Sequence, residues 1–337
     1  MTIRVGINGF GRIGRGFVRA ALSRPDVEIV AVNDLTSTAT LGHLLKYDST
    51  QGRLDADVSW TEDTITINGR VISVLAERDP SKLPWGTLDV DIVIESTGRF
   101  TTRAEAATHL AAGARKVIIS APASDVDGTF VVGVNDADYD PVSHDVISNA
   151  SCTTNCFVPM VKVLDDAFGI TTGLMTTVHA YTNDQNLLDL PHKDLRRARG
   201  AAINIVPSST GAARATGLVL AAMKGRLDGT SLRVPVPVGS ITDFTAVVRK
   251  TSVDEVNAAF RKAAEGDLGR VLVYTDEPIV SSDIVGTPAS CTFDAEMTMV
   301  TPIDDHTSLV KVFGWYDNEW GYSNRLVDLS HVVGSRR

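Results

Sequence analysis

A cysteine at the start of an apolar stretch is the residue of this chain best placed to do chemistry. Cys152 stands in the hexapeptide SCTTNC (151–156), and apolar residues follow it at helical spacing as far as Phe168. The spacing predicts a helix that begins at or near Cys152. Because a helix N-terminus carries partial positive charge, we expect a lowered pKa for this thiol and a nucleophilic thiolate.

We expect the other two cysteines to be packing residues. Cys156 lies one helical turn beyond Cys152, where an apolar wall would raise the pKa of its thiol, and we expect Cys291 to be a buried strand residue. A zinc site is disfavoured, because the spacing is CxxxC and no second cysteine pair exists. A redox pair of Cys152 and Cys156 is compatible with the spacing but is not specified by it. No metal is therefore expected.

His179 is the candidate base for the thiol. It lies in a β-rich run (175–180) that leads into polar residues, and a cysteine nucleophile is usually activated by a histidine within hydrogen-bond reach. A single histidine on a strand is also typical of a structural residue. The sequence alone does not bring the imidazole to the thiol, so both interpretations stay open at this point.

The chain begins with a pattern typical of a nucleotide-binding turn. Residues 3–8 alternate apolar side chains, the run GFGRIG follows, and apolar residues then recur at helical spacing to Leu22. Gly9 would allow a tight turn, Gly11 the approach of a pyrophosphate, and Gly14 close contact of helix and strand. The pattern predicts a dinucleotide site at the start of this helix.

A carboxylate follows the second predicted strand (27–32). Asp34 lies twenty residues after Gly14, where a carboxylate can accept hydrogen bonds from both hydroxyls of an adenosine ribose. The same charge would repel the 2′-phosphate of NADP. NAD is therefore the predicted cofactor.

The rest of the first half alternates strands and helices. Strands are predicted at 90–95 and 116–120, with a helix over about 103–112 between them. An antiparallel hairpin at 64–74, turning at Asn-Gly, interrupts the alternation and is expected at the sheet edge. These features predict an α/β, Rossmann-type nucleotide-binding domain.

Composition limits the class of protein. The 337 residues suffice for two domains of ~150 residues each. The formal net charge is -9, so neither nucleic acid nor a membrane surface is expected as the primary partner. Three cysteines cannot form a disulfide framework, and no secretory signal or membrane-spanning run is evident, so we expect a cytoplasmic protein.

Five ordered motifs together resemble one enzyme family. They are GFGRIGR (9–15), SCTTNC (151–156), HAYT (179–182), STGAA (209–213) and WYDNE (315–319). Over about residues 3–330 the chain closely resembles the phosphorylating, NAD-dependent glyceraldehyde-3-phosphate dehydrogenases. The resemblance implies oxidative phosphorylation of D-glyceraldehyde 3-phosphate to 1,3-bisphosphoglycerate with NAD and inorganic phosphate, a step of glycolysis and gluconeogenesis.

The resemblance gives the covalent chemistry to two residues. Cys152 would attack the aldehyde carbon to form a thiohemiacetal. His179 would activate the thiol and take the hydroxyl proton as hydride leaves the carbon. The product is a thioester, which keeps the acyl-transfer reactivity that inorganic phosphate needs to displace the enzyme.

Two anion pockets follow from that reaction. The family pattern matches the substrate phosphate to Thr182, Arg233 and one arginine of the 195–199 segment, Arg196 or Arg197. It matches the inorganic phosphate to Ser151, Thr153, Thr210 and Gly211. Residues 191–235 carry a net charge of +6 and the remainder -15, so a cationic segment stands in an acidic chain.

The resemblance also implies the cofactor contacts and an assembly. The matched residues are Gly11, Arg12 and Ile13 at the pyrophosphate, Asp34 at the ribose, Arg78 and Ser120 at the nucleotide, and Asn318 at the nicotinamide carboxamide. Leu190-Pro191 matches the NAD-preferring form of a loop that a neighbouring subunit contributes. A long polar loop near 180–203 fits burial at such an interface, so a homotetramer is implied.

We expect residues 1–151 and 317–337 to form the NAD-binding domain, its last helix lying over about 319–333. Residues 152–316 would form an α+β catalytic domain with a mostly antiparallel sheet. Its strands are predicted at 232–250, 271–274 and 308–316.

Two alternatives stay open. A relative that acts on erythrose 4-phosphate uses water rather than phosphate as the final acceptor, and the same fold could carry an added binding role. The sequence also distinguishes neither the direction of flux nor a housekeeping enzyme from an inhibitor-resistant duplicate.

Overall fold

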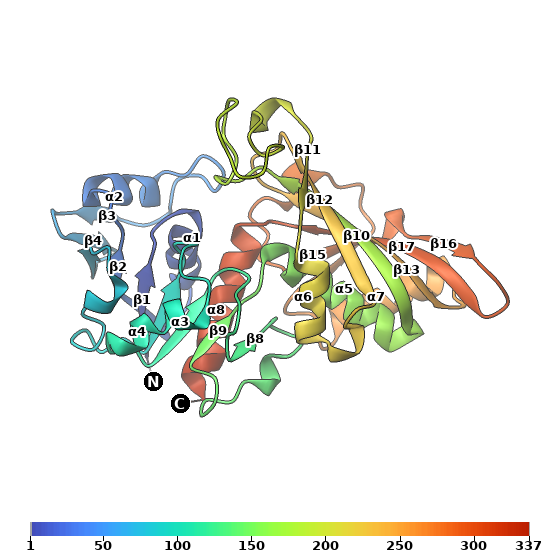
Figure 1. Cartoon of the computed structure of the whole chain (residues 1–337), viewed down its shortest axis with the longest axis horizontal. Helices are drawn as coiled ribbons and strands as arrows, with labels where there is room; N and C mark the ends of the chain where they lie inside the picture. The colour runs from blue at the N-terminus through green and yellow to red at the C-terminus, as the bar shows by residue number, and fades with distance from the viewer. Residues whose placement is uncertain (1, 337) are drawn as a thin grey trace. The chain divides into compact units, whose positions relative to one another are not determined.

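The computed structural model describes residues 2–336, whose contacts divide them into two compact units (Figure 1). The first unit holds the described residues up to Phe130, Asp136–Ala150 and the residues from Ser323 onward. The second unit holds Val131–Asn135 and Ser151–Tyr322. The chain therefore enters each unit more than once.

The segment 317–322 lies in the second unit, whereas the expected boundary gave it to the first. Its side chains explain the difference. Asp317 Oδ2 accepts a hydrogen bond from the Gly286 N–H at 2.8 Å, and Asn318 Oδ1 accepts one from the Gly239 N–H at 3.1 Å. These bonds hold the segment to the second unit, and the return to the first begins at Ser323.

The first unit is built on a largely parallel sheet. In the described residues it has nine strands, in the order β3-β4-β5-β2-β1-β6-β7-β9-β8. They are β1 (Ile3–Asn8), β2 (Val27–Asn33), β3 (Val58–Trp60), β4 (Thr64–Ile67), β5 (Arg70–Leu75), β6 (Ile92–Glu95), β7 (Lys116–Ile119), β8 (Gly128–Thr129) and β9 (Val146–Ser148). All neighbours from β5 to β8 pair in parallel, so the carboxyl ends of these strands lie at one edge. The predicted α/β architecture is confirmed.

The predicted hairpin is confirmed and is more closely joined to the sheet than expected. β4 and β5 pair antiparallel around Asn68 and Gly69, whose φ angles of 49° and 80° suit a tight turn. β5 also pairs in parallel with β2, from Ala31 to Asn33. The hairpin is thus the outer part of the main sheet.

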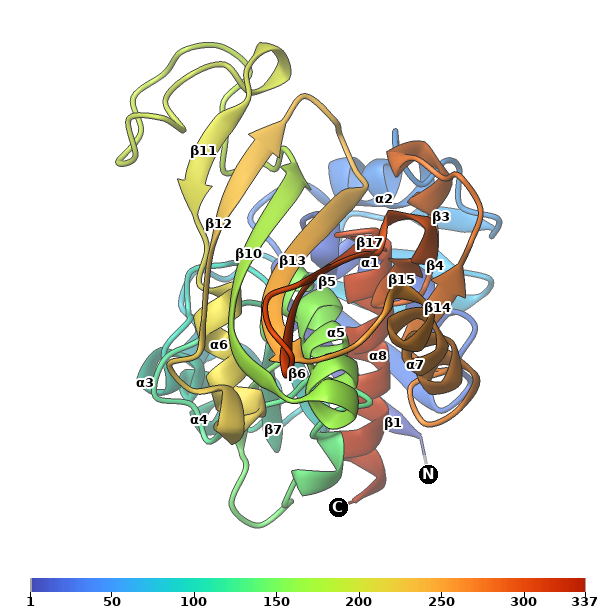
Figure 2. The same ribbon diagram turned by 90° about the vertical axis from the view of Figure 1, so that its right-hand side faces the viewer.

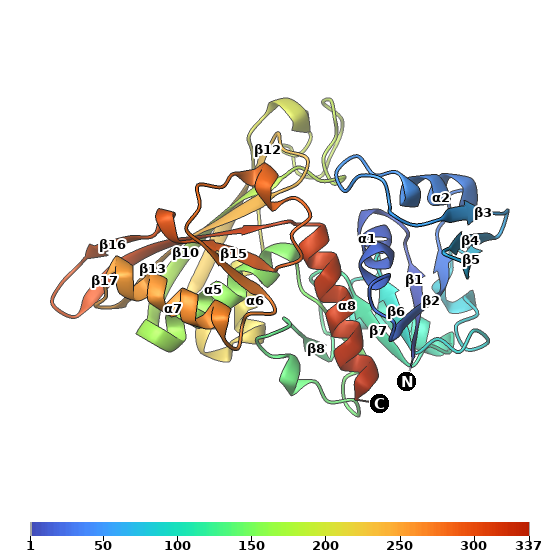
Figure 3. The same cartoon turned by 180° about the vertical axis from the view of Figure 1, so that it is seen from behind.

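The helices of the first unit include a C-terminal one. They are α1 (Arg12–Ala21), α2 (Thr38–Lys46), α3 (Arg103–Ala106), α4 (Thr108–Ala111) and most of α8 (Trp320–Ser335), the long red helix of Figure 3. The helix expected over 103–112 is therefore two short ones. A Cβ at Gly16 of α1 would meet Ser323 Oγ at 2.4 Å, and one at Gly334 would meet Ile3 Cδ1 at 2.5 Å. Both glycines allow α8 to approach the rest of the unit closely.

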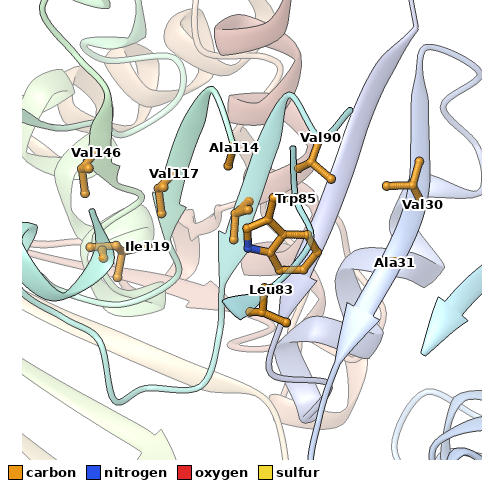
Figure 4. Close-up of a cluster of buried hydrophobic side chains, with 11 residues drawn as sticks. Val30, Ala31, Leu83, Trp85, Val90, Ala114, Val117, Ile119 and Val146 are labelled. Carbon is orange, nitrogen blue, oxygen red and sulfur yellow. The ribbon is translucent and has the colours of Figure 1, made fainter. Parts of the chain in front are cut away.

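Trp85 anchors a core cluster of the first unit (Figure 4). The fully buried indole lies with Leu83, Val90 and Val117 among aliphatic side chains. A Cβ at Gly6 of β1 would lie 2.7 Å from the Trp85 ring, so the glycine lets the indole lie directly on the strand. This core supports the central strands whose ends border the predicted nucleotide site.

The second unit is built on a mixed, mostly antiparallel sheet, as expected. Its order in the described residues is β11-β12-β10-β13-β17-β15-β14, with β16 paired to β17 (Figure 2). The strands are β10 (Ile170–Ala180), β11 (Val206–Ser209), β12 (Leu227–Val234), β13 (Ser240–Arg249), β14 (Leu272–Thr275), β15 (Cys291–Asp294), β16 (Met299–Pro302) and β17 (Thr307–Tyr316). The β10/β12 and β14/β15 pairs are parallel and the other pairs antiparallel.

The strand expected over 232–250 is two strands. β12 ends at Val234 and β13 begins at Ser240. Pro235 and Pro237 interrupt the run because proline has no N–H for a ladder, and Gly239 turns the chain with a φ of 92°. The turn carries the chain from beside β10 on one side to beside β10 on the other.

Helix α5 (Cys152–Phe168) contacts the sheet, and α6 (Ala212–Val219) and α7 (Val253–Glu265) contact α5. Where β17 meets α5, a Cβ at Gly314 would lie 2.5 Å from Met160 Sδ, 2.6 Å from Cys291 Sγ and 3.1 Å from Cys156 Sγ. Burial and the Cys291 thiol raise the pKa of Cys156 well above its usual value. Both cysteines are fully buried packing residues, as predicted.

Candidate active site and cofactor site

Cys152 is the first residue of α5, where the sequence predicted it. The helix begins there because Ser151 is its N-cap: the Ser151 hydroxyl accepts a hydrogen bond from the Thr154 N–H at 3.0 Å. The residue before the cap, Ala150, has a φ of 56°, so the chain turns sharply into the helix. Cys152 is half-buried at the end of this turn.

His179 lies near the end of β10 and faces the thiol. Its Nε2 is 3.4 Å from Cys152 Sγ, within hydrogen-bond distance for sulfur, and the side chain is buried. The pairing depends on the contact of α5 with β10, which brings together residues 27 positions apart. The structure thus joins the two candidate residues that the sequence could not place together.

The site favours the neutral form of both groups. Burial, and then the charge of Arg233, lower the pKa of His179 to about 3. Burial raises the pKa of the Cys152 thiol, and the Arg233 charge opposes this only in part. The lowered Cys152 pKa predicted from the helix N-terminus is therefore wrong, because burial outweighs the favourable charges. A neutral thiol beside a neutral imidazole is an arrangement for general-base catalysis.

Arg233 is the cation closest to this pair. It lies on β12 directly opposite His179, and its Nη1 is 2.7 Å from His179 Nδ1 and donates to the Ala180 carbonyl at 3.0 Å. Its Nε is buried and has no hydrogen-bond acceptor among the described residues. A buried guanidinium with an unused donor fits an anion such as a phosphate oxygen.

The structure separates the two candidate arginines. Arg197 is one-fifth exposed, forms an ion pair with Asp184, and its charge is among those that lower the pKa of Arg233 after burial. Arg196 is exposed and lines an open pocket with Thr210 and Arg214. Arg197, and not Arg196, therefore belongs to the electrostatic surroundings of Arg233.

The expected hydroxyl donors differ in their availability. Thr182 is half-buried just beyond β10. Thr210 lies just before α6 and its hydroxyl accepts from the Ala212 N–H at 3.2 Å, and a Cβ on Gly211 would meet nothing within 4 Å. The Thr153 hydroxyl, in contrast, is buried 2.9 Å from the Tyr316 hydroxyl. Thr153 is therefore engaged with Tyr316, and the Ser151 hydroxyl with the helix cap.

Tyr316 is a site residue that the sequence analysis missed. Its hydroxyl lies 2.9 Å from that of Thr153 and 2.7 Å from that of Thr177, and its ring meets the His179 ring edge-on at 5.9 Å. It thereby joins α5, β10 and β17. The alternation of β17 could have indicated a buried Tyr316, but nothing local indicates the partners of its hydroxyl.

The glycine turn in the first unit fits a dinucleotide. Gly9 has a φ of 94°, and a Cβ on Gly14 would lie 2.3 Å from the Gly9 carbonyl oxygen, so both positions require glycine. A Cβ on Gly11 would meet nothing within 4 Å, and α1 has no side-chain cap. Open space at an uncapped helix N-terminus suits a pyrophosphate.

Two residues expected to contact the cofactor around that turn are already hydrogen-bonded to other groups. Asp34 is half-buried at the end of β2, where Oδ2 accepts from the Phe10 N–H at 2.9 Å. The guanidinium of Arg12 instead donates to Asp48 at 2.5 Å, so its backbone is the part that borders the turn. Although burial opposes it, hydrogen bonds from Gln51, Arg12 and Thr50 hold the pKa of Asp48 below its usual range.

The remaining cofactor candidates lie on several elements: Ile13 in α1, Arg78 beyond β5, Ser120 just after β7 and Asn318 just after β17. Ile13 and Ser120 are half-buried and Arg78 is exposed. Asn318 is buried, and its Oδ1 accepts from the Gly239 N–H at 3.1 Å and from the Ser240 hydroxyl at 3.0 Å. These bonds fix the amide so that its Nδ2 points away from them, available to an acceptor such as a carboxamide oxygen.

In the described part of the chain, no group of three or more His, Cys, Asp or Glu side chains could hold a metal ion. Among residues 2–336, none of the helices combines the length and the apolar character needed to cross a bilayer.

Comparisons with known proteins agree with the geometry. Residues 3–103 match the family model of the glyceraldehyde 3-phosphate dehydrogenase NAD-binding domain, and residues 151–318 that of its C-terminal domain. The chain is 66% identical over 338 residues to glyceraldehyde-3-phosphate dehydrogenase 2 of Streptomyces avermitilis, with 100% of both chains covered. It is 59% identical to the enzyme of Geobacillus stearothermophilus, covering 100% of this chain and 99% of that protein. The chain belongs to the glyceraldehyde-3-phosphate dehydrogenase family and is an NAD-dependent oxidoreductase.

Proposed function

We propose that this enzyme oxidises and phosphorylates D-glyceraldehyde 3-phosphate to 1,3-bisphosphoglycerate, using Cys152 as the nucleophile and His179 as the base. The observation that carries the proposal is the 3.4 Å contact of Cys152 Sγ with His179 Nε2 at the start of α5. The contact supplies a proton acceptor at the one atom that must lose a proton when the thiol attacks.

His179 would accept and return the proton that moves in each step. As Sγ attacks the aldehyde carbon, the thiol proton is relayed through His179 to the carbonyl oxygen, which completes the thiohemiacetal. His179 Nε2 then takes the hydroxyl proton while the carbon gives up hydride. Bound NAD supplies the hydride acceptor. The resulting thioester is cleaved by a phosphate oxygen, and the Cys152 thiolate leaves and regains the proton from His179.

Two groups of residues are proposed to hold the phosphates. Arg233, Arg197 and Thr182 would bind the substrate phosphate. The charge of Arg197 lowers the pKa of Arg233 in addition to burial, and the Arg233 Nε has no hydrogen-bond acceptor among the described residues. Ser151, Thr153, Thr210 and Gly211 would surround the inorganic phosphate. Thr153 would contribute chiefly its backbone N–H, because its hydroxyl already meets Tyr316.

The first unit is proposed to hold NAD and the second to carry the catalysis. Gly11, Arg12 and Ile13 would offer backbone N–H groups to the pyrophosphate, and Asp34 would accept from the adenosine ribose. Arg78 and Ser120 would border the nucleotide, and Asn318 would bind the carboxamide through its Nδ2.

We further propose a homotetramer located in the cytoplasm. Four leucines of the 181–200 loop are strongly exposed, with Leu187 at 76%, Leu188 at 77%, Leu190 at 58% and Leu195 at 81%. Apolar side chains so exposed on one loop are typical of a subunit interface. The free thiols of Cys152, Cys156 and Cys291 suit a reducing compartment.

A phosphate-dependence assay tests the reaction. NAD reduction is measured with glyceraldehyde 3-phosphate and with erythrose 4-phosphate, each with and without inorganic phosphate. We expect rapid turnover only with glyceraldehyde 3-phosphate and phosphate together, and none with Cys152→Ser. Turnover that does not depend on phosphate, or that favours erythrose 4-phosphate, would contradict the proposed reaction.

A further inference from the structure

A hydrogen-bonded network of buried polar side chains lies under the carboxyl edge of the parallel sheet. Asn8, Asn33 and Glu95 are the last residues of β1, β2 and β6 and are 2%, 5% and 2% exposed. Asn33 Nδ2 donates to Asn8 Oδ1 at 2.7 Å, and Asn8 Nδ2 donates to Glu95 Oε2 at 2.6 Å. The three central strands are thus joined at the edge where α/β sheets bind ligands.

At the Trp85 end of this network, the donor and the acceptor of each hydrogen bond are fixed. The Trp85 indole, whose nitrogen is drawn in Figure 4, donates to His109 Nδ1 at 3.0 Å. An indole N–H can only donate, so Nδ1 must accept, and the proton of the neutral ring sits on Nε2. His109 Nε2 therefore donates to Glu95 Oε2 at 2.9 Å.

The other oxygen of Glu95 holds the turn after β6. Oε1 accepts from the Thr97 N–H at 2.8 Å and from the Thr97 hydroxyl at 2.5 Å. With His109 and Asn8 on Oε2, both carboxylate oxygens meet only donors. These partners require a carboxylate at this position. A carboxylic acid or an amide would point a hydrogen of its own at one of these donors.

At the other end of the network, Asn33 holds the segment before Arg78. Asn33 Nδ2 donates to the Glu77 carbonyl at 2.9 Å, and Asn33 Oδ1 accepts from the Glu77 N–H at 2.8 Å. One side chain thus clamps both polar groups of a loop residue. The network therefore borders the Gly9 turn, the 77–78 loop and the turn at Thr97, while none of its buried members lies in the proposed contacts with the cofactor.

We propose that Glu95 is a positioning residue for NAD, which preorganises these three loops before the cofactor binds. The inference rests on the proposed role of this edge as the cofactor site. Loops that are already ordered need not be ordered by the ligand, so the network favours binding through a lower entropic cost. Glu95 touches neither the reacting atoms nor, in this proposal, the cofactor itself.

Replacing the carboxylate by an amide tests the arrangement. In Glu95→Gln the amide NH₂ must face either Thr97 or His109, and neither the Thr97 N–H nor the His109 Nε2–H can reverse. Asp91→Asn is the matched control. Asp91 is a buried carboxylate just before the opposite end of β6, where it accepts from the Arg4 N–H at 2.8 Å. Both changes remove a buried carboxylate at one end or the other of β6, but only the first lies under the nucleotide edge.

The measurements are the Kd of NAD by titration calorimetry, the KM for NAD, kcat at saturating NAD, and the urea midpoint of unfolding. For Glu95→Gln we expect Kd and KM to rise about 10-fold, with kcat changed less than about twofold, in line with one or two lost charge-assisted hydrogen bonds. For Asp91→Asn the midpoint should fall while the Kd stays as in the wild type.

Thr97→Val keeps the inference testable if Glu95→Gln does not fold. It removes one of the four donors to Glu95 from a half-buried side chain and should raise the Kd about threefold. An unchanged Kd in Glu95→Gln, or in Thr97→Val where the first variant is unfolded, overturns the inference. So does a Kd that rises equally in Asp91→Asn. Failure of the wild-type protein to bind NAD would instead contradict the proposed function.

Discussion

Arg233 Nη1 lies 2.7 Å from His179 Nδ1, and that same ring nitrogen is 2.7 Å from the Ala180 carbonyl oxygen. A donor and an acceptor therefore compete for one atom, and the tautomer of His179 decides between them. When Nδ1–H donates to Ala180, Nε2 is free to take the thiol proton of Cys152. We expect an anion that engages Arg233 to favour this form, which would link substrate binding to activation of the base.

Removing the Arg233 charge should slow the reaction of the free thiol. That charge opposes the rise in the Cys152 pKa caused by burial, so Arg233→Leu raises this pKa further. Less thiolate is then present at any given pH, and the pH profile of iodoacetamide alkylation should move to higher pH. The KM for glyceraldehyde 3-phosphate should also rise at least about 10-fold. Arg226→Leu, an exposed arginine of the same unit, is the control, and an identical alkylation profile in both variants would count against this role.

Arg196 and Arg197 provide a matched comparison of adjacent cations. Arg197→Ala should raise the KM for glyceraldehyde 3-phosphate about 10-fold or more, because its charge acts at Arg233. Arg196→Ala removes an exposed charge and should change KM less than about twofold. Steady-state kinetics at fixed NAD and phosphate give both values. Equal effects of the two changes would show that the segment acts only through its total charge.

The Tyr316 hydroxyl should stabilise the site and hold its geometry. Tyr316→Phe leaves the Thr153 and Thr177 hydroxyls without this partner, so the free energy of unfolding should fall by about 1–3 kcal/mol. Because Thr153 adjoins Cys152, kcat should fall as well. Urea unfolding and initial rates measure the two effects. Tyr274→Phe is the control, because the Tyr274 hydroxyl accepts from exposed Arg261. This change should lower the free energy of unfolding by less than about 0.5 kcal/mol. A similar loss in both variants would refute a special role for Tyr316.

Asp34 should determine the choice of cofactor. Asp34→Gly or Asp34→Ala removes the carboxylate at the end of β2 that would repel a 2′-phosphate. We expect the ratio of kcat/KM for NAD to that for NADP to fall about 10-fold or more. The loss of the acceptor for the Phe10 N–H should also reduce stability slightly. Asp55→Gly, at an exposed position of the same unit, should leave the ratio unchanged; a ratio unchanged in the Asp34 variants too would exclude the ribose role.

Local patterns predicted the parts of the site that depend on neighbours in the sequence. The glycine turn, the helix start at Cys152 and the Asn-Gly hairpin depend on steric demands and spacing within a few residues, and all three are present. The relation of α5 to β10 is different, because only the folded sheet brings His179 to the thiol. The family resemblance supplied that pairing, whereas periodicity did not.

Long-range contacts and burial account for what the sequence missed. Tyr316 lies 163 residues from Thr153, and Trp85 lies 24 residues from His109, so no local spacing reveals either bond. The Cys152 pKa was predicted in the wrong direction for the same reason. A helix N-terminus can be read from adjacent residues, but the burial that outweighs it comes from elements distributed along the chain.

Helix α8 has a consequence for the order in which the polypeptide matures during translation. Its residues from Ser323 onward complete the first unit, where Ser323 lies against Gly16 and Asp328 accepts from Arg24 at 2.9 Å. The first unit is therefore completed only after the residues of the second unit have been synthesised. Since a ribosome releases the chain from its N-terminus, the nascent nucleotide-binding unit stays incomplete, with its surface for α8 uncovered, until residues 323–335 have been made.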